Sequence, residues 1–437
     1  MIIDESFFES SDFKEKLENY ERCLAEGKTP FMEADDLTDI ADYYNFCGDV
    51  DKAHEAIDLA LDLTPGATLP LVFKTKEALQ AGDIEQAERY AASIADKDDP
   101  ETVYLAAEIM IARGEDEKAD AFLKDTINEI EDEIMQDYIT DVAYIWCESN
   151  YFERANEWLA MIDNADSSDN ADLQELIGRI NFGLQNYKKC IEAFNKVIDK
   201  KPFSARTWYA LASAHYFSED MENALKSIDF AIAIKPANPD NLHMKGSILM
   251  KQKEYAQAIE LFTQYITMVP DDMLAYVNLA ACYRSTGEIE KAVKLAKMAV
   301  NGSDRDAAFQ ACEELVFLEL ERGDAIDALE WVDKADTLTE DISEKLVLRA
   351  YVMLAQRRLE EAMPVFMEAI DRAEDKMYVV SRMIAAFFDN GYKRMGMWAT
   401  RYYCEELQDI TDEELDAMTP EDLMAYLEKK TKTNEKQ

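Results

Sequence analysis

Apolar residues along this chain recur at the three-to-four-residue spacing of helices, in short segments that come in pairs. One pair occupies residues 205–234, where the positions that follow this spacing are Trp208, Leu211, Ala212, His215, Ala224, Ile228 and Ala231. The polar sequence SEDM separates the two segments. Such spacing marks the apolar face of an amphipathic helix. The pattern therefore predicts two helices joined by a short turn.

This pair belongs to a repeat with a period of 34 residues. The period is visible in the prolines Pro202, Pro236 and Pro270 and, in phase with them, in the alanines Ala224, Ala258 and Ala292. Proline ends a helix because it has no amide hydrogen to donate, and alanine allows two helix axes to approach closely. A fixed period of this size is typical of stacked helix pairs.

The order of bulky residue, leucine, small residue and aromatic, followed by alanine, a large apolar residue, alanine and proline, resembles the tetratricopeptide repeat. His215 stands where that family usually has tyrosine. The resemblance extends over about residues 34–410 and is strongest in the three central units. It implies an all-α fold: a right-handed alpha-alpha superhelix, or solenoid, of about eleven tetratricopeptide-type helix pairs.

The same frame predicts the organisation of the chain. We expect an N-terminal capping helix in residues 1–33, the repeat solenoid in residues 34–410, and a C-terminal capping helix with a polar tail in residues 411–437. Terminal helices with one polar face prevent end-to-end stacking of a solenoid.

Charge excludes some classes of partner. The chain carries 91 Asp and Glu against 46 Lys and Arg, a formal net charge of −45, which repels nucleic acid and anionic membrane surfaces. Residues 1–170 hold about 44 acids and 13 bases, whereas residues 171–308 hold about 17 of each. The start of the chain has no basic leader, and no later run is apolar enough to span a bilayer. We therefore expect a cytoplasmic protein without membrane insertion.

Residues for catalysis are scarce. The chain has three histidines, its seven cysteines never form a CxxC pair, and no hydrolase, metalloprotease or nucleotide-binding motif occurs. We expect a protein that is not an enzyme and that has no cofactor, no metal site and no disulfide framework.

The binding surface is expected on the concave face, which the resemblance assigns to the first helix of each pair. The candidate protein-binding residues are Arg179, Phe182, Arg206, Tyr209, Tyr216, His243, Met250 and Arg284 in the neutral centre, and Tyr104, Glu108 and Tyr144 in the acidic first third. Packing against the adjacent pair is an equal alternative for each aromatic residue. The lysine and asparagine clamp with which some family members hold a carboxylate end is absent, because the corresponding positions hold residues such as Tyr209 with Ser213.

The leading hypothesis is a non-enzymatic scaffold or adaptor that binds a peptide or protein segment on the concave face of an acidic superhelix. Aromatic anchors would supply affinity, and the acidic field would favour a basic or amphipathic client. The alternative is a structural or self-associating subunit of a larger complex, including a homo-oligomer, with no peptide ligand.

Overall fold

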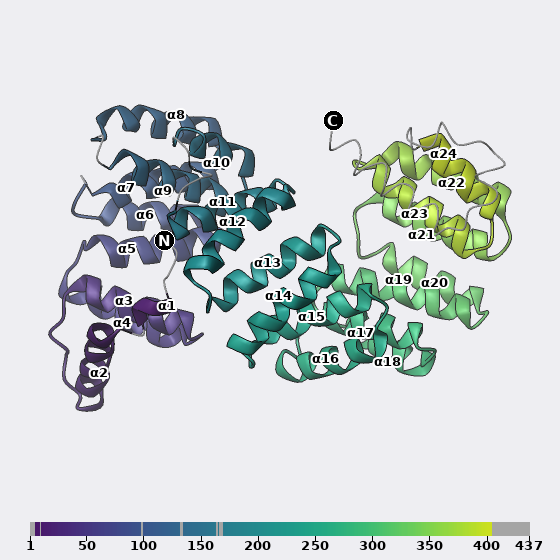
Figure 1. Ribbon diagram of the computed structural model, residues 1–437, viewed down its shortest axis with the longest axis horizontal. Helices are drawn as coiled ribbons and strands as arrows, with labels where there is room; N and C mark the ends of the chain where they lie inside the picture. The colour runs from purple at the N-terminus through teal and green to yellow at the C-terminus, as the bar shows by residue number, and fades with distance from the viewer. Residues whose placement is uncertain are drawn as a thin grey trace. The chain divides into compact units, whose positions relative to one another are not determined.

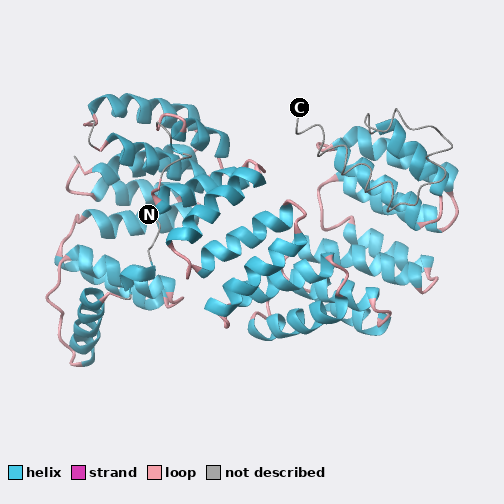
Figure 2. Ribbon diagram, viewed as in Figure 1, coloured by secondary structure: helices cyan, strands magenta, loops and turns pink. Residues whose placement is uncertain are grey.

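The computed structural model of the chain describes residues 5–8, 10–97, 99–131, 134–162, 165 and 169–403, and every regular element in these ranges is a helix (Figures 1 and 2). The all-α fold class is confirmed. The chain divides into two compact units between Glu219 and Asp220. The predicted C-terminal helix and tail of residues 411–437 lie outside the described residues, and the predicted domain boundaries stay predictions.

The first unit contains the elements from α1 to α13. Their bounds are α1 Glu5–Phe8, α2 Ser11–Ala25, α3 Ala34–Phe46, α4 Val50–Leu63, α5 Thr68–Gln80, α6 Ile84–Ser93, α7 Pro100–Ala112, α8 Asp116–Thr126, the 3₁₀ helix η1 Ile127–Glu129, α9 Met135–Glu148, α10 Phe152–Leu159, α11 Ala171–Gly183, α12 Tyr187–Lys200 and α13 Ala205–Phe217.

The second unit contains the helices from α14 onward. Their bounds are α14 Met221–Ile234, α15 Pro239–Lys251, α16 Tyr255–Met268, α17 Met273–Ser285, α18 Ile289–Val300, α19 Arg305–Glu321, α20 Ala325–Ala335, α21 Ile342–Ala355, α22 Leu359–Arg372, α23 Lys376–Asp389 and α24 Lys393–Tyr403. From α3 onward, the described helices alternate as the first and second members of eleven successive pairs along the chain. The predicted number of pairs agrees with this order.

The turn inside every pair contains one residue with a positive φ. Six of these eleven residues are glycines, as at Gly82 and Gly114, which adopt this left-handed conformation without steric cost. The other five are not glycine: they are Asn150, Gln185, Glu219, Lys253 and Arg357. Glycine therefore marks only part of the turns in the sequence, and the same backbone geometry is imposed on ordinary residues in the rest.

Small residues let the two helices of a pair pack closely. A Cβ atom added to Gly178 on α11 would lie 2.7 Å from the ring of Phe194 on α12, and one added to Gly246 on α15 would lie 3.0 Å from the ring of Phe262 on α16. Both phenylalanines are buried. A large side chain on the second helix thus fills the space that a missing side chain leaves on the first.

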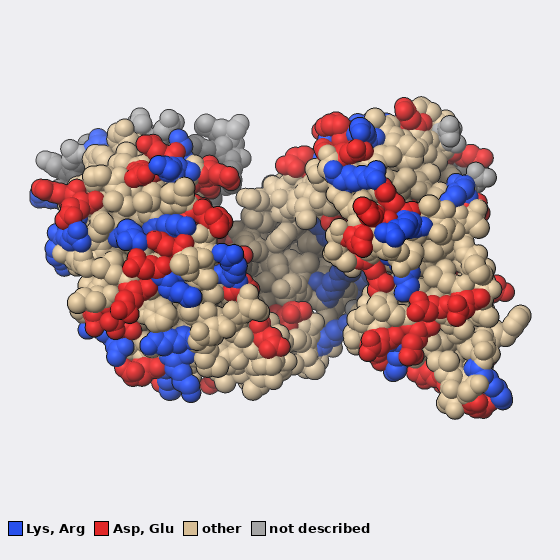
Figure 3. Space-filling model, turned by 180° about the vertical axis from the view of Figure 1, so that it is seen from behind, with Lys and Arg blue, Asp and Glu red and all other residues tan. Residues whose placement is uncertain are grey.

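The first helices form a continuous layer within each unit. In the first unit α3, α5, α7, α9 and α11 each contact the next member of this series, and in the second unit α15, α17, α19, α21 and α23 do the same. We call these two layers the first-helix surfaces. Acidic and basic side chains are interspersed on the face of the protein drawn in Figure 3.

Helix α2 precedes the first pair. It buries Phe13 and Tyr20 in a core cluster with α3 and α4 residues such as Leu37 and Ile57. Ser10 caps its start by accepting a hydrogen bond from the amide of Phe13 at 3.2 Å. These contacts hold α2 against the first pair.

Candidate functional site

A pocket of the first unit lies where α9 and α11, the last two helices of its first-helix surface, meet α13. Its volume is about 510 Å³. This value lies within the range of about 300–1,000 Å³ that is typical of ligand-binding pockets. Four of the predicted binding residues line it, namely Arg179, Phe182, Arg206 and Tyr209. We call it the α9–α11–α13 pocket.

Arg179 is a half-buried cation in this pocket. Its Nη2 donates a hydrogen bond to Oε1 of Glu148 on α9, and its guanidinium lies over the ring of Tyr144, 5.4 Å from the centroid. Nη1 is buried and has no hydrogen-bond acceptor. Burial alone would lower the pKa of Arg179, but the hydrogen bond to Glu148, the charge of Glu148 and smaller contributions from neighbouring groups together outweigh burial, so the pKa is raised. The pocket therefore holds a charged group with one unused donor.

Arg206 repeats this arrangement one helix pair later. Its Nε lies 3.6 Å from Oε1 of Glu175 on α11, and Arg206 itself is largely exposed. Each arginine is thus placed beside a carboxylate from the preceding first helix. With Glu148 and Glu175 also in the lining, the formal charges of the pocket cancel.

The remaining wall of the pocket is largely apolar. Cys147, Phe152 and Phe194 contribute to it, and Phe182 packs edge-on against Phe217 with ring centroids 5.6 Å apart. Burial raises the pKa of Cys147 to about 11, so its thiol stays protonated and is a poor nucleophile at neutral pH. This wall suits an apolar side chain rather than a reacting group.

Tyr104, Glu108 and Tyr144 lie on the same first-helix surface but do not line the pocket. The hydroxyl of Tyr104 donates to Oδ2 of Asp141 at 3.1 Å. Glu108 lies 3.5 Å from Nζ of Lys76, and burial raises the pKa of its carboxyl. Only Tyr144 adjoins the pocket, through its contact with Arg179.

The other predicted residues pack against neighbouring apolar or aromatic side chains or form an ion pair. His243 packs against Phe262 and Tyr265 at centroid distances of 5.5 and 5.0 Å, and burial lowers its pKa. Met250 packs on the cluster that contains Phe262, and Tyr216 lies edge-on to Phe217.

Arg284 on α17 pairs with the buried Glu314 on α19. The structure does not bring Tyr216, His243, Met250 or Arg284 into the α9–α11–α13 pocket. Their role in binding stays a prediction.

Some pocket residues were not predicted from the sequence, notably Glu148, Phe152 and Glu175. A signal for two of them exists, because Glu148 precedes Arg179 by 31 residues and Glu175 precedes Arg206 by the same interval. Opposite charges about one repeat apart on first helices indicate pairs across neighbouring repeats.

The described residues contain neither a metal-binding cluster nor a membrane-spanning helix. No group of three or more His, Cys, Asp or Glu side chains in them could hold a metal ion. Among their helices, none has both the length and the apolar character that a bilayer-spanning helix needs.

The ordered helix pairs and their first-helix surfaces define a helical repeat protein. Residues 205–238 and residues 249–313 match the tetratricopeptide repeat family. These two segments are tetratricopeptide repeats, as the resemblance predicted.

Curated relatives cover parts of the chain. Small glutamine-rich tetratricopeptide repeat-containing protein 2 of Saccharomyces cerevisiae is 29% identical over 145 residues, which are 33% of this chain and 41% of that protein. Anaphase-promoting complex subunit 7 of Dictyostelium discoideum is 22% identical over 180 residues, 41% of this chain and 31% of that protein. The chain spans less than half the length of the curated relatives it matches.

Solved structures of similar fold include yeast Tom70. It has a TM-score of 0.43 and 13% sequence identity, and the match covers 93% of this chain and 97% of that chain.

Proposed function

We propose that this protein is a non-enzymatic scaffold that binds a peptide or protein segment on the first-helix surface of its first unit, anchored in the α9–α11–α13 pocket. The observation that carries the proposal is the convergence of two arginines and an apolar wall in one pocket on a continuous helical layer. The tetratricopeptide repeats of the chain, and relatives of which one is named as a co-chaperone and another as a subunit of a complex, support the general role. A cytoplasmic location stays a prediction.

The pocket suits a client with one large apolar side chain. Such a side chain would bury itself against Phe152, Phe182 and Phe194, and burial of this kind contributes roughly 1.5–3 kcal/mol. A client carbonyl oxygen would accept a hydrogen bond from the exposed guanidinium of Arg206. Because the formal charges of the pocket cancel, client binding should depend only weakly on salt.

The test is a comparison of variants as bait in lysate of the source cell. Tyr209→Ala removes an aromatic group from the pocket wall, and Tyr402→Ala removes an exposed tyrosine on α24 as the matched control. We expect a partner that binds the unaltered protein and the control at both about 50 and about 500 mM salt, and that is depleted about tenfold or more with Tyr209→Ala. Circular dichroism must show unchanged helical content for both variants.

Two results would contradict the proposal. A partner retained equally by both variants would place binding outside the pocket. Recovery of the bait alone, together with a dimeric mass by light scattering, would support the structural or self-associating alternative instead.

A further inference from the structure

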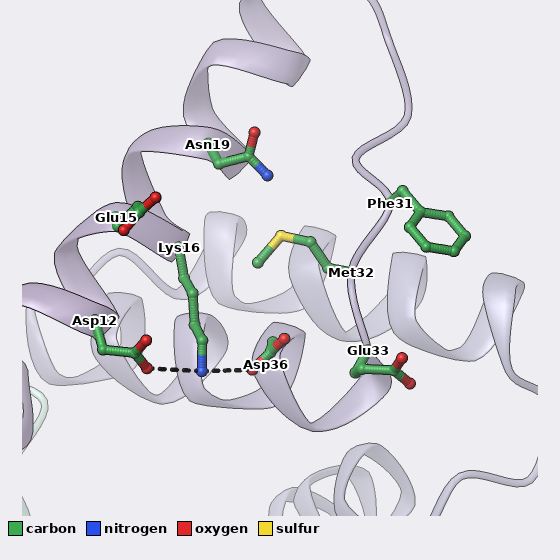
Figure 4. A pocket seen from close by; sticks show the side chains of 8 residues that line it. All are labelled: Asp12, Glu15, Lys16, Asn19, Phe31, Met32, Glu33 and Asp36. Carbon is green, nitrogen blue, oxygen red and sulfur yellow. Dashed lines mark ion pairs between the residues drawn. The ribbon is translucent and has the colours of Figure 1, made fainter.

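A second hollow lies where α2 meets the start of α3, and it shares no residue with the α9–α11–α13 pocket. Its volume is about 300 Å³. Two side chains of the linker before α3, Phe31 and Met32, form its apolar part, and four carboxylates together with Lys16 and Asn19 form the rest (Figure 4). We call it the α2–α3 hollow.

Phe31 is the most exposed large apolar side chain of the described residues, with 100% of its surface accessible. The adjacent Pro30 is buried, and Met32 packs against the core cluster of α2, α3 and α4. In Figure 4 the Met32 side chain extends from the linker toward α2, below Asn19, and Phe31 stands at the edge of the hollow. An anchored linker thus presents a phenylalanine to solvent beside a half-covered methionine.

The charges around these two residues are unbalanced. The lining contains four carboxylates and one cation, Lys16. Nζ of Lys16 lies 3.0 Å from Oδ2 of Asp12 and 2.8 Å from Oδ1 of Asp36 (Figure 4), and these hydrogen bonds raise its pKa. Lys16 is therefore committed to the contact between α2 and α3.

The two other carboxylates of the lining belong to Glu15 on α2 and Glu33 just before α3. Neither has a side-chain ion pair or hydrogen bond among the contacts of the described residues, and both are exposed. Glu33 occupies the N-cap position of α3 without using its side chain as a cap. These two carboxylates remain available to a cation from outside the chain.

We propose that the α2–α3 hollow docks a partner segment in which a lysine or arginine adjoins a large apolar side chain. The apolar side chain covers Phe31 and Met32, and the cation pairs with Glu33 on the same linker, within the field of the other carboxylates. Charge complementarity selects this occupant, since the lining carries a formal charge of −3 within residues 1–170, the most acidic part of the chain. A second copy of a chain with a net charge of −45 would be repelled.

The test uses fluorescence anisotropy with the full-length protein and a labelled octapeptide probe, Gly-Ser-Lys-Leu-Lys-Trp-Gly-Ser. Phe31→Ala removes the exposed ring, and the double variant Glu15→Gln with Glu33→Gln removes the two unpaired charges. The matched controls are Phe203→Ala, at another highly exposed phenylalanine, and Glu192→Gln with Glu260→Gln, at two exposed glutamates. Since Phe31 is fully exposed, its removal leaves the fold unchanged, which thermal melting checks.

We expect Phe31→Ala and the Glu15/Glu33 double variant each to weaken probe binding about tenfold, and the controls to stay within about twofold of the unaltered protein. Replacing both lysines of the probe with glutamate, or its leucine and tryptophan with serine, should abolish binding. Tyr209→Ala, which tests the proposed function, should leave probe binding unchanged.

Three results would overturn the inference. The unaltered protein could fail to bind the probe, or every glutamate variant could weaken binding equally, which would indicate diffuse attraction to an acidic surface. A photoreactive probe with benzoylphenylalanine in place of leucine could also cross-link outside residues 11–37. Cross-linking within that range would support the site independently of the variants.

Discussion

The ion pair between Arg284 and Glu314 allows a sharp test of whether a predicted binding residue is structural. Nε and Nη2 of Arg284 lie 2.6 and 3.3 Å from the two carboxylate oxygens of Glu314, and Nη1 lies 3.1 Å from Oε1 of Glu321. Glu314 is only 6% exposed on α19. Arg284→Met keeps an unbranched apolar stem on α17 but leaves this carboxylate buried without its cation.

The cost follows from the burial of Glu314. Removing one partner of a buried ion pair costs about 3–5 kcal/mol, and the partial exposure of Arg284 places this pair at or slightly below the lower end, about 3 kcal/mol. In a repeat protein the loss is confined to neighbouring repeats. Amide exchange in α17 and α19 should then accelerate about a hundredfold, while exchange in α5 stays unchanged.

The effect should also depend on pH. Burial raises the pKa of Glu314 above its ordinary value, whereas Arg284 opposes that rise, so removing Arg284 raises the pKa further. Between the ordinary pKa of a glutamate and the raised pKa of Glu314, the folded state then binds more protons than the unfolded state. The free energy of unfolding therefore falls as pH increases through this range. The destabilisation by Arg284→Met should be smaller near pH 5 than near pH 7.5.

The assay is hydrogen exchange read by mass spectrometry, corrected for the intrinsic effect of pH. The matched control is Arg358→Met, the same substitution at an exposed arginine of the second unit that pairs with Glu361. Exchange in α17 and α19 that changes less than about threefold would refute the reasoning. If exchange stayed unchanged in this way but Arg284→Met weakened client binding, Arg284 would be a binding residue, as the sequence predicted.

Three further predictions concern stability, each measured by urea unfolding. Burial raises the pKa of Asp42 to about 6, so the free energy of unfolding falls as pH rises from about 4 through 6. Asp42→Asn should therefore stabilise the protein by about 1–2 kcal/mol at pH 7.5 and by almost nothing at pH 4. An equal gain at both pH values would contradict this explanation. Gly178→Ala places a Cβ against the ring of Phe194 and should cost about 1–3 kcal/mol; an unchanged midpoint would show that the ring moves freely. Lys253→Gly relieves a φ of 64° and should stabilise by about 0.5–1 kcal/mol, and a loss of stability would refute that account.

Helix pairs were predictable because their signal is local. The spacing of Leu211, Ala212, Ala224 and Ile228 reports which residues of one pair are buried, and all four are buried. Turns were less visible in the sequence, since five of them use a residue such as Lys253 in a conformation that glycine normally marks. In these five turns the stacked helices impose the positive φ, and the residue type gives no sign of it.

The candidate site was predictable in part. Arg179, Phe182, Arg206 and Tyr209 were selected as first-helix residues, and they line one pocket. His243 and Arg284 satisfied the same rule, but they contact Phe262 and Glu314 instead. Position within a repeat does not distinguish these cases, because each outcome depends on which side chain the next repeat supplies.

By itself, the sequence determined the class of fold, the order of the helix pairs and the acidic character of the chain, because periodicity and composition are properties of residues in line. Only the tertiary structure decided which side chains meet. It paired Arg179 with Glu148 from the preceding repeat, buried Glu314 beneath Arg284, and left Phe31 exposed in an acidic hollow. Such contacts join residues about 30 positions apart or lie where a linker crosses two helices, and their strength depends on burial that no single helix can establish.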